Sequence, residues 1–226
     1  MLTVALFSLR SDNVWFMEDV ALEARMRGIG AVVAAEAPHV VCLQEVTPAI
    51  EALFRAAPWW RAYDASPAPG GAPYYTLLLL RRPTAGGGDA KGVPPLRRTP
   101  FANSAQGRDL LAGGLPLGGG VRLLAGTSHL ESFLRADMNG SEQRKAQIKT
   151  ALSALDAAHD CGNAVFAGDL NWDDGTDGDV AARLPPGWRD AWTALRPGEP
   201  GHTYDAPANA MLMARAPACL PHVAAP

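Results

Sequence analysis

Short apolar runs alternate with amphipathic helical patterns along this chain, and this alternation restricts the fold more than any other feature of the sequence. Val4–Leu9 and Val40–Gln44 are apolar runs of strand length. Between them, Glu18–Glu36 has the periodicity of a helix whose apolar face consists of Leu22, Met26, Ile29 and Val33. The order is strand, helix, strand at first and mixed further on, which predicts an α/β fold with strands in both directions.

The rest of the chain continues this pattern. We expect strands over Tyr74–Arg82, Val121–Leu130 and Asn163–Gly168, and helices over Thr47–Ala57 and Ser141–His159. Thr47 is expected to cap its helix, with Pro48 in the first turn. Two segments are rich in glycine: we expect Pro83–Pro95 to be a surface loop and Gly113–Gly120 to be the turn of a hairpin.

Length, charge and cysteine content exclude several classes of protein. A length of 226 residues suits one domain with a buried core. Twenty basic and 23 acidic residues give a net charge of −3, which excludes a strongly basic nucleic-acid coat, so any contact with a phosphate backbone must be local. The three cysteines, Cys42, Cys161 and Cys219, are too far apart for a disulfide scaffold or a zinc site, and they favour a reducing compartment.

No segment of the sequence indicates membrane insertion or export. No apolar run approaches the roughly 20 residues that cross a bilayer. The first ten residues, Met1–Arg10, lack the basic start and the small-residue cleavage site of a signal peptide, and they resemble a buried strand. We therefore expect no membrane partner.

Polar side chains stand at four of the expected strand ends. They are Asn13, Gln44 with Glu45, His129, and Asp169 with Asn171. In open α/β folds ligands bind outside strand ends, so this placement indicates a binding site. Asp169 and Asn171 are two positions apart, and both side chains would point to one side if the strand continued that far.

The residue types at these ends suggest metal-assisted phosphate chemistry. Carboxylate and amide oxygens suit Mg²⁺, which takes few protein ligands besides water and phosphate. Histidine and asparagine can donate hydrogen bonds to phosphoryl oxygens. Each residue also has a structural interpretation: Asn13 as a turn residue, Glu45 as part of a helix cap, His129 as a structural histidine. Their combination at strand ends favours a functional site.

Several segments resemble the endonuclease/exonuclease/phosphatase superfamily of Mg²⁺-dependent phosphodiesterases, and within it the branch that acts on tyrosine–DNA linkages, in its plant and algal forms. The match extends over residues 1 to about 212. The segments that carry it are Ser11–Phe16, Val41–Pro48, Gly107–Leu111, Thr127–Ser132, Phe166–Asn171, Asp190–Trp192 and His202–Asp205.

The resemblance implies a four-layer α/β sandwich in which two mixed β-sheets lie face to face and are flanked by helices. It also implies a role for each matching residue. Glu45 would bind the metal with Asn13 beside it, and Asp169 would orient and activate the attacking water. His129 and Asn171 would hold the phosphate, and Arg108 and Trp192 would contact the substrate.

The same resemblance implies a cofactor, a substrate and a cellular role. The cofactor would be Mg²⁺, with Mn²⁺ as a substitute. The substrate would be a DNA 5′ end that carries a phosphotyrosyl adduct from a trapped type II topoisomerase. The chain would then act as a monomer in double-strand break repair, in the nucleus and to a lesser extent in the cytoplasm.

The C-terminal part departs from the family pattern. The family's terminal Ser-Asp-His motif has no counterpart, and His222 is the only candidate for its histidine. We therefore expect an incomplete catalytic domain over residues 1–212 with its last strands missing, a disordered tail over residues 213–226, and weak or no activity from the chain as given.

Two alternatives remain open at the level of the sequence. The chain could belong to another branch of the superfamily, with abasic DNA, RNA tails, inositol phosphates or sphingomyelin as its substrate. It could also be a catalytically impaired protein that binds DNA ends.

Overall fold

The computed structural model describes residues 7–83, 93–133, 139–158, 163–199, 201 and 203. The chain forms two compact units: the first comprises Met1–Glu131 and Glu142–Asn171, and the second comprises Ser132–Ser141 and Trp172–Pro226. All strands in the described residues belong to the first unit. The single catalytic domain expected over residues 1–212 stays a prediction, and the tail over residues 213–226, with His222, lies outside the described residues.

The first sheet has the strand order β1-β2-β4-β3. Its strands are β1 (Leu9–Asn13), β2 (Val40–Val46), β3 (Tyr63–Ala65) and β4 (Tyr75–Arg81). β1 and β2 run parallel, whereas the other neighbours are antiparallel. β2 is almost wholly buried, as its apolar run Val40–Leu43 predicts for a strand covered on both faces.

The second sheet has the order β5-β6-β7-β8. Its strands are β5 (Arg97–Pro100), β6 (Asp109–Gly118), β7 (Val121–His129) and β8 (Ala164–Asp169). Here β7 and β8 are the parallel pair and the other neighbours are antiparallel. Each sheet is therefore mixed and has one parallel pair at an edge.

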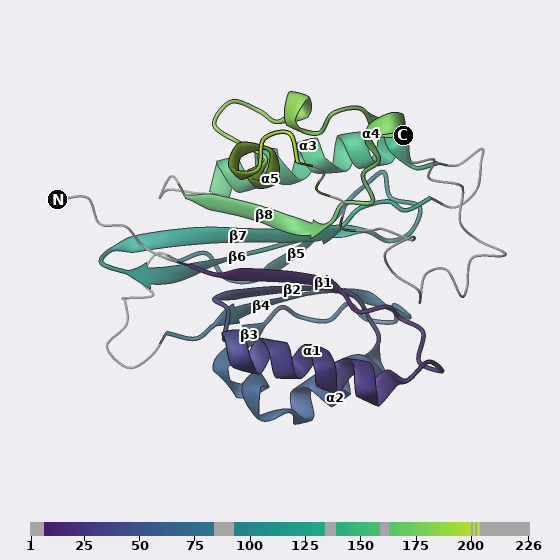
Figure 1. The fold of residues 1–226 in the computed structure, drawn as a ribbon, viewed down its shortest axis with the longest axis vertical. Helices are drawn as coiled ribbons and strands as arrows, with labels where there is room; N and C mark the ends of the chain where they lie inside the picture. The colour runs from purple at the N-terminus through teal and green to yellow at the C-terminus, as the bar shows by residue number, and fades with distance from the viewer. Residues whose placement is uncertain are drawn as a thin grey trace. The chain divides into compact units, whose positions relative to one another are not determined.

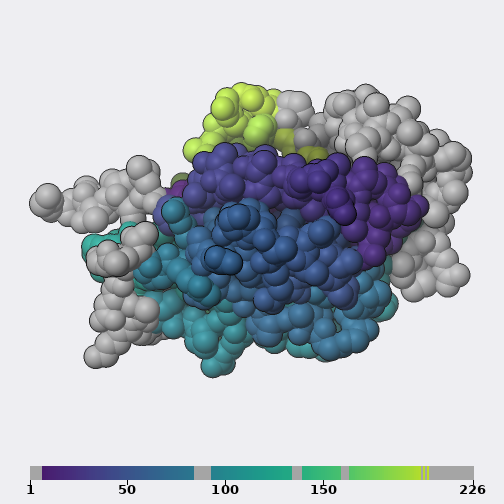
Figure 2. Space-filling view, turned by 90° about the horizontal axis from the view of Figure 1, so that it is seen from below, coloured from purple at the N-terminus to yellow at the C-terminus, as the bar shows by residue number. Residues whose placement is uncertain are grey.

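The two sheets pack face to face, with helices on both outer sides (Figure 1). A cluster of apolar residues from both sheets fills the space between them: Val40, Cys42, Leu78, Leu80, Leu111, Leu115, Leu123 and Ala125. The helices α1 (Leu22–Glu36) and α2 (Pro48–Ala56) cover the outer face of the first sheet, and Figure 2 looks onto this face, where they lie side by side. The helix α3 (Ser141–Ala158) covers the second sheet, where Leu155 packs over Gly126. The four-layer sandwich is confirmed.

Local signals in the sequence placed most helices correctly. Thr47 caps α2 as expected, because its Oγ1 accepts a hydrogen bond from the backbone N–H of Ile50 at 3.2 Å. The first long helix begins at Leu22 rather than at Glu18, because Ala21 adopts a left-handed conformation with φ 43°. A short 3-10 helix, η1 (Pro58–Ala62), links α2 to β3.

The hairpin turn expected over Gly113–Gly120 is only partly correct. The chain turns at Gly118–Gly120, whereas Gly113 and Gly114 lie inside β6. A Cβ atom at Gly113 would lie 2.7 Å from Cδ2 of Leu96, and one at Gly114 would lie 2.5 Å from Cγ1 of Val93. These two glycines therefore allow close packing within a strand, where the composition suggested a turn.

The first strand and the first loop lie partly outside the described residues. β1 is observed at Leu9–Asn13, later than the expected Val4–Leu9, and residues 1–6 are not described. Residues 84–92 of the expected Pro83–Pro95 loop are also not described. Among the helices that the structure describes, none is long and apolar enough to cross a bilayer.

The second unit contains short helices. They are α4 (Asp174–Asp177), the 3-10 helix η2 (Ala181–Arg183) and α5 (Ala191–Leu195). Asp173 and Asp190 cap α4 and α5, because their side chains accept hydrogen bonds from the N–H groups of Thr176 and Thr193 at 2.8 and 2.6 Å. The acidic composition of this segment thus serves, in part, to start helices.

Candidate active site

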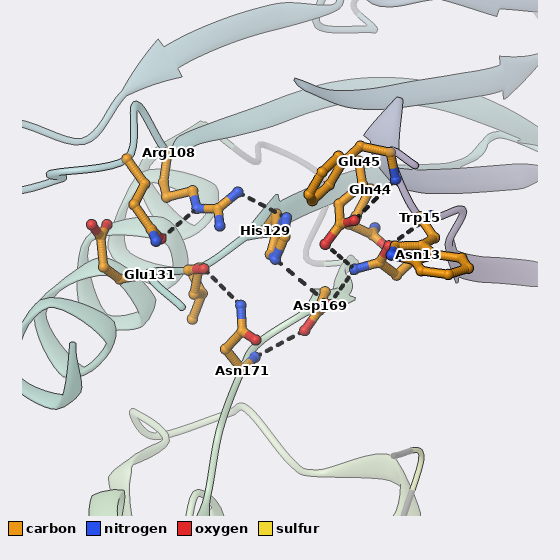
Figure 3. A network of polar contacts seen from close by, with 12 residues as sticks. Asn13, Trp15, Gln44, Glu45, Arg108, His129, Glu131, Asp169 and Asn171 are labelled. Atoms are coloured by element: carbon orange, nitrogen blue, oxygen red, sulfur yellow. Dashed lines mark hydrogen bonds and ion pairs between the residues drawn. The ribbon is translucent and has the colours of Figure 1, made fainter. Parts of the chain in front are cut away.

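The carboxyl ends of the two parallel strand pairs meet across the sandwich. Asn13 at the end of β1 is in register with Gln44 of β2, and His129 at the end of β7 is in register with Asp169 of β8. The side-chain amide of Asn13 donates one hydrogen bond to Oδ2 of Asp169 at 2.8 Å and another to Oε1 of Glu45 at 2.9 Å (Figure 3). The side chains predicted from four strand ends therefore form one cluster.

Glu45 occupies a strained position at the end of β2. The β2–β4 register shifts between Leu43 and Val46, and Glu45 has φ 61°, a conformation that residues with a side chain rarely adopt. Strain of this kind concentrates at functional sites. Both oxygens of the Glu45 carboxylate accept hydrogen bonds, Oε1 from the Asn13 amide and Oε2 from the backbone N–H of Phe16 at 3.1 Å. The carboxylate thus has a fixed orientation.

Asp169 and Asn171 come together through a turn, because β8 ends at Asp169, close to the expected end at Gly168. Asn171 has φ 47°, and its backbone N–H donates to Oδ1 of Asp169 at 3.0 Å. Its side-chain amide donates to the carbonyl oxygen of Leu130 at 2.9 Å. The Asp169 side chain is 27% exposed, so it is available to water.

His129 is held as a neutral hydrogen-bond donor. Nη1 of Arg108 lies 2.8 Å from Nδ1 of His129, and a guanidinium can only donate, so Nδ1 is the acceptor and Nε2 carries the proton. That Nε2 lies 3.6 Å from Oδ2 of Asp169. Burial and, to a lesser degree, the charge of Arg108 lower the pKa of His129 to about 4, against the opposing effect of Asp169.

The lowered pKa of His129 predicts a loss of stability in acid. Between the usual pKa of 6.5 and the folded value of about 4, the unfolded chain binds more protons than the folded one. Folding stability is therefore intact above about pH 6.5 and falls as the pH drops towards 4, by about 3 kcal/mol in total and about 2 kcal/mol by pH 5. Urea unfolding with EDTA at pH 7 and pH 5 should show this loss in the parent chain and a smaller one in His129→Gln. Equal losses in the two proteins would contradict it.

A buried polar network supports Arg108. Its backbone N–H donates to Oγ of Ser104 at 2.8 Å, and that hydroxyl donates to Oε2 of Glu131 at 2.8 Å. Glu131 also accepts hydrogen bonds from the N–H of Ala105 and from Nε2 of Gln147. The Arg108 side chain is buried against His129, so a contact of Arg108 with the substrate stays a prediction.

The oxygen ligands at this site fit a magnesium ion. Glu45 presents an oriented and partly exposed carboxylate next to the Asn13 amide. Within the described part of the chain, no group of three or more His, Cys, Asp or Glu side chains could hold a metal ion, so an ion at this site would have few protein ligands. Magnesium binds through one or two carboxylates and completes its shell with water and phosphate oxygens. Glu45 is therefore the residue that would hold it.

The structure brings most of the predicted site residues together. Asn13, Glu45, His129, Asp169, Asn171 and Arg108 lie in one network (Figure 3). Trp192 lies in α5 of the second unit, so its substrate contact stays a prediction. The role of the Phe16 N–H could not be predicted, because every residue except proline carries a backbone N–H and residue identity does not show which one is used. The spacing of Glu131 two positions after His129 was a signal that could have indicated it, whereas Gln147 lies in a mostly polar helical segment that gave none.

Comparison with protein families and curated proteins gives one consistent result. The sequence model of the Endonuclease/Exonuclease/phosphatase family matches residues 13–209. The chain is 34% identical over 214 residues to tyrosyl-DNA phosphodiesterase 2 of Rattus norvegicus, an alignment that covers 93% of this chain and 53% of the relative. The chain thus spans about half the length of the curated relatives it matches.

Solved structures agree with the sequence comparison. The fold is similar to that of tyrosyl-DNA phosphodiesterase 2 from C. elegans, with a TM-score of 0.68, 26% identity, and coverage of 83% of this chain and 53% of that one. It is also similar to the D. rerio enzyme complexed with a single-strand DNA product, with a TM-score of 0.65, 29% identity, and coverage of 84% and 70%.

Proposed function

Because the chain belongs to the endonuclease/exonuclease/phosphatase family, we propose that it is a Mg²⁺-dependent phosphodiesterase that hydrolyses the bond between a tyrosine and a DNA 5′ phosphate. The similarity to tyrosyl-DNA phosphodiesterase 2 supports this substrate, and the D. rerio relative that binds a DNA product supports DNA as the partner. The net charge of −3 limits contacts with the DNA backbone to the neighbourhood of the site.

One observation supports the proposal most strongly: the Asn13 amide joins the Glu45 and Asp169 carboxylates across the two sheets. A structural role would not require two acids to share one donor in a partly exposed position, because like charges repel each other. A cation held at Glu45 would offset this repulsion and make the arrangement favourable. The neutral N–H of His129, next to Asp169, adds a donor for the phosphate.

The residues of the site would then have separate roles in the hydrolysis. Asp169 orients the attacking water and accepts its proton, since its two oxygens are held by Asn13 and Asn171. Nε2–H of His129 donates to a phosphoryl oxygen as negative charge develops there, and the Asn171 amide assists. Bound at Glu45, Mg²⁺ would supply charge neutralisation at the phosphate.

The cellular part of the proposal follows from the substrate. A 5′-phosphotyrosyl end arises where a type II topoisomerase stays linked to a double-strand break. We therefore place the protein in the repair of such breaks in the nucleus, where it acts as a monomer.

A cleavage panel tests the proposed substrate. The protein is incubated with Mg²⁺ and, in turn, with a 5′-phosphotyrosyl oligonucleotide, an abasic duplex, an oligoadenylate, an inositol polyphosphate and sphingomyelin. We expect the phosphotyrosyl oligonucleotide to be cut fastest, leaving a 5′ phosphate. If it stays intact while another substrate is cut, the chain belongs to another branch of the family. Binding to DNA ends with no cleavage in any reaction would instead indicate a binding protein.

A further inference from the structure

The loop that follows β1 holds one side of the proposed metal site. Residues 14–21 lie outside helices and strands, and the N–H of Phe16 in this loop donates to Oε2 of Glu45 at 3.1 Å. The N–H of Trp15 donates to Oδ1 of Asn13 at 3.0 Å (Figure 3). The orientations of Glu45 and Asn13 therefore depend on the conformation of this loop.

Arg25, in the first turn of α1, binds the loop at four points. Its Nη1 donates to the carbonyl oxygens of Val14 at 2.6 Å and Trp15 at 3.0 Å. Its Nη2 donates to the carbonyl oxygen of Met17, and its Nε donates to that of Val20 at 2.8 Å. The loop thus closes around a single guanidinium.

These contacts hold a backbone that would not adopt this conformation alone. Trp15 has φ 60° and Ala21 has φ 43°, both in the left-handed region that disfavours side chains. The Arg25 guanidinium also lies over the Trp15 ring, 5.1 Å from its centroid. Burial lowers the pKa of Arg25, against the opposing effect of Asp19, so the charge is kept partly out of water to make these contacts.

The loop has a second anchor at Phe16. The Phe16 ring stacks on the Tyr74 ring with centroids 5.0 Å apart and planes inclined by 11°. Arg25 fixes the carbonyls of the loop and Tyr74 fixes the Phe16 ring, so two independent contacts hold the segment that carries the Phe16 N–H. Neither anchor touches the Glu45 carboxylate in the contacts described above.

We propose that Arg25 is a positioning residue for the metal site: it fixes the 14–21 loop so that the Phe16 N–H holds Glu45 in its metal-binding orientation. This inference rests on the proposed function, because it takes Glu45 as the metal ligand. Residues that orient a metal ligand typically contribute 10- to 100-fold to metal affinity.

Arg25→Lys tests the inference, with Arg27→Lys as the matched control. Lysine keeps the charge but offers a compact ammonium, which cannot reach four carbonyls in the fixed pattern of the guanidinium. Arg27 lies on the same helix with a side chain 76% exposed, and its ion pair partner is Glu23, away from the loop carbonyls. Two quantities are measured in the full chain: amide hydrogen exchange of residues 14–21, and the dissociation constant for Mn²⁺ by calorimetry.

We expect Arg25→Lys to exchange faster over residues 14–21 and to bind Mn²⁺ about 10- to 100-fold more weakly than the parent, with no change in Arg27→Lys. Unchanged exchange in Arg25→Lys would overturn the inference. Faster exchange with unchanged Mn²⁺ affinity would overturn it as well, because the loop would then not set the metal site. If the parent chain itself binds no Mn²⁺, the proposed function is contradicted, and the titration of the parent chain alone shows this.

Phe16→Ala provides a second test of the inference if Arg25→Lys does not fold. It removes a half-exposed ring and its stacking on Tyr74 while the Phe16 N–H position stays in the chain. The same loosening of residues 14–21 and the same weaker Mn²⁺ binding are expected. Parent-like affinity in a folded Phe16→Ala with a loosened loop would also overturn the inference.

Discussion

Asp169→Asn should lower the single-turnover rate of cleavage by about 10²- to 10⁴-fold, the usual contribution of a general base, while DNA-end binding stays close to that of the parent. The amide has the shape of the carboxylate but cannot accept a proton. Both Asp169 oxygens accept hydrogen bonds, from Asn13 and Asn171, and an asparagine can accept at only one of them. A stability loss of about 1 kcal/mol should accompany the rate loss.

Cleavage rates, DNA binding and thermal melts of Asp169→Asn are compared with those of Asp64→Asn. Asp64 is an exposed carboxylate on β3, paired with Arg82 on the surface. This control should cleave DNA at the parental rate. A rate loss of less than roughly tenfold in Asp169→Asn would count against its role as the base.

Glu45→Gln should abolish Mg²⁺ binding and, with it, activity. The change removes the charge that attracts the ion and keeps the size of the side chain. It also places an amide nitrogen against one of the two donors, Asn13 Nδ2 and the Phe16 N–H, that now hold the carboxylate. Calorimetric titration with Mg²⁺ gives the affinity directly, and Glu23→Gln, an exposed change on α1, is the control. Parental Mg²⁺ affinity in Glu45→Gln would show that another residue holds the metal.

The strand ends were the part of the site that the sequence could predict. An apolar run of strand length is a local signal, and the polar residue that closes it is visible in the sequence, as for Gln44 after Val40–Leu43. Since ligands in open α/β folds bind outside strand ends, Asn13, Glu45, His129 and Asp169 could be assigned to one site from the sequence alone. The four-layer arrangement, by contrast, came from the resemblance and not from periodicity.

Features that depend on backbone conformation could not be predicted. The left-handed conformations of Trp15 and Glu45 belong to residue types that rarely adopt them, so composition gave no warning there, whereas Asn171 lies in a segment whose composition is typical of a turn. The opposite error occurred at Gly113 and Gly114, where glycine indicated a turn but serves close packing against Leu96 and Val93. In both cases tertiary contacts decide the conformation, and these are not local properties of the sequence.

Partners of buried polar groups form a second class of missed features. The resemblance implied that Arg108 contacts the substrate, which stays a prediction, but it did not indicate that the Arg108 guanidinium also contacts Nδ1 of His129. The end of a predicted strand indicates where a residue lies along the sheet, but it does not indicate which side chain that residue contacts. The tautomer of His129, on which its role as a donor depends, follows only from that contact.

Release of free tyrosine from a 5′-phosphotyrosyl oligonucleotide, followed for hours with the protein in excess, tests the proposed chemistry most directly. With Mg²⁺, the parent chain should release tyrosine and leave a 5′ phosphate on the DNA. EDTA, Glu45→Gln and Asp169→Asn should each suppress the release. Tyrosine release in EDTA or by Asp169→Asn that is as fast as release by the parent chain with Mg²⁺ would contradict the proposed chemistry. So would the absence of release by a folded parent chain that binds Mg²⁺.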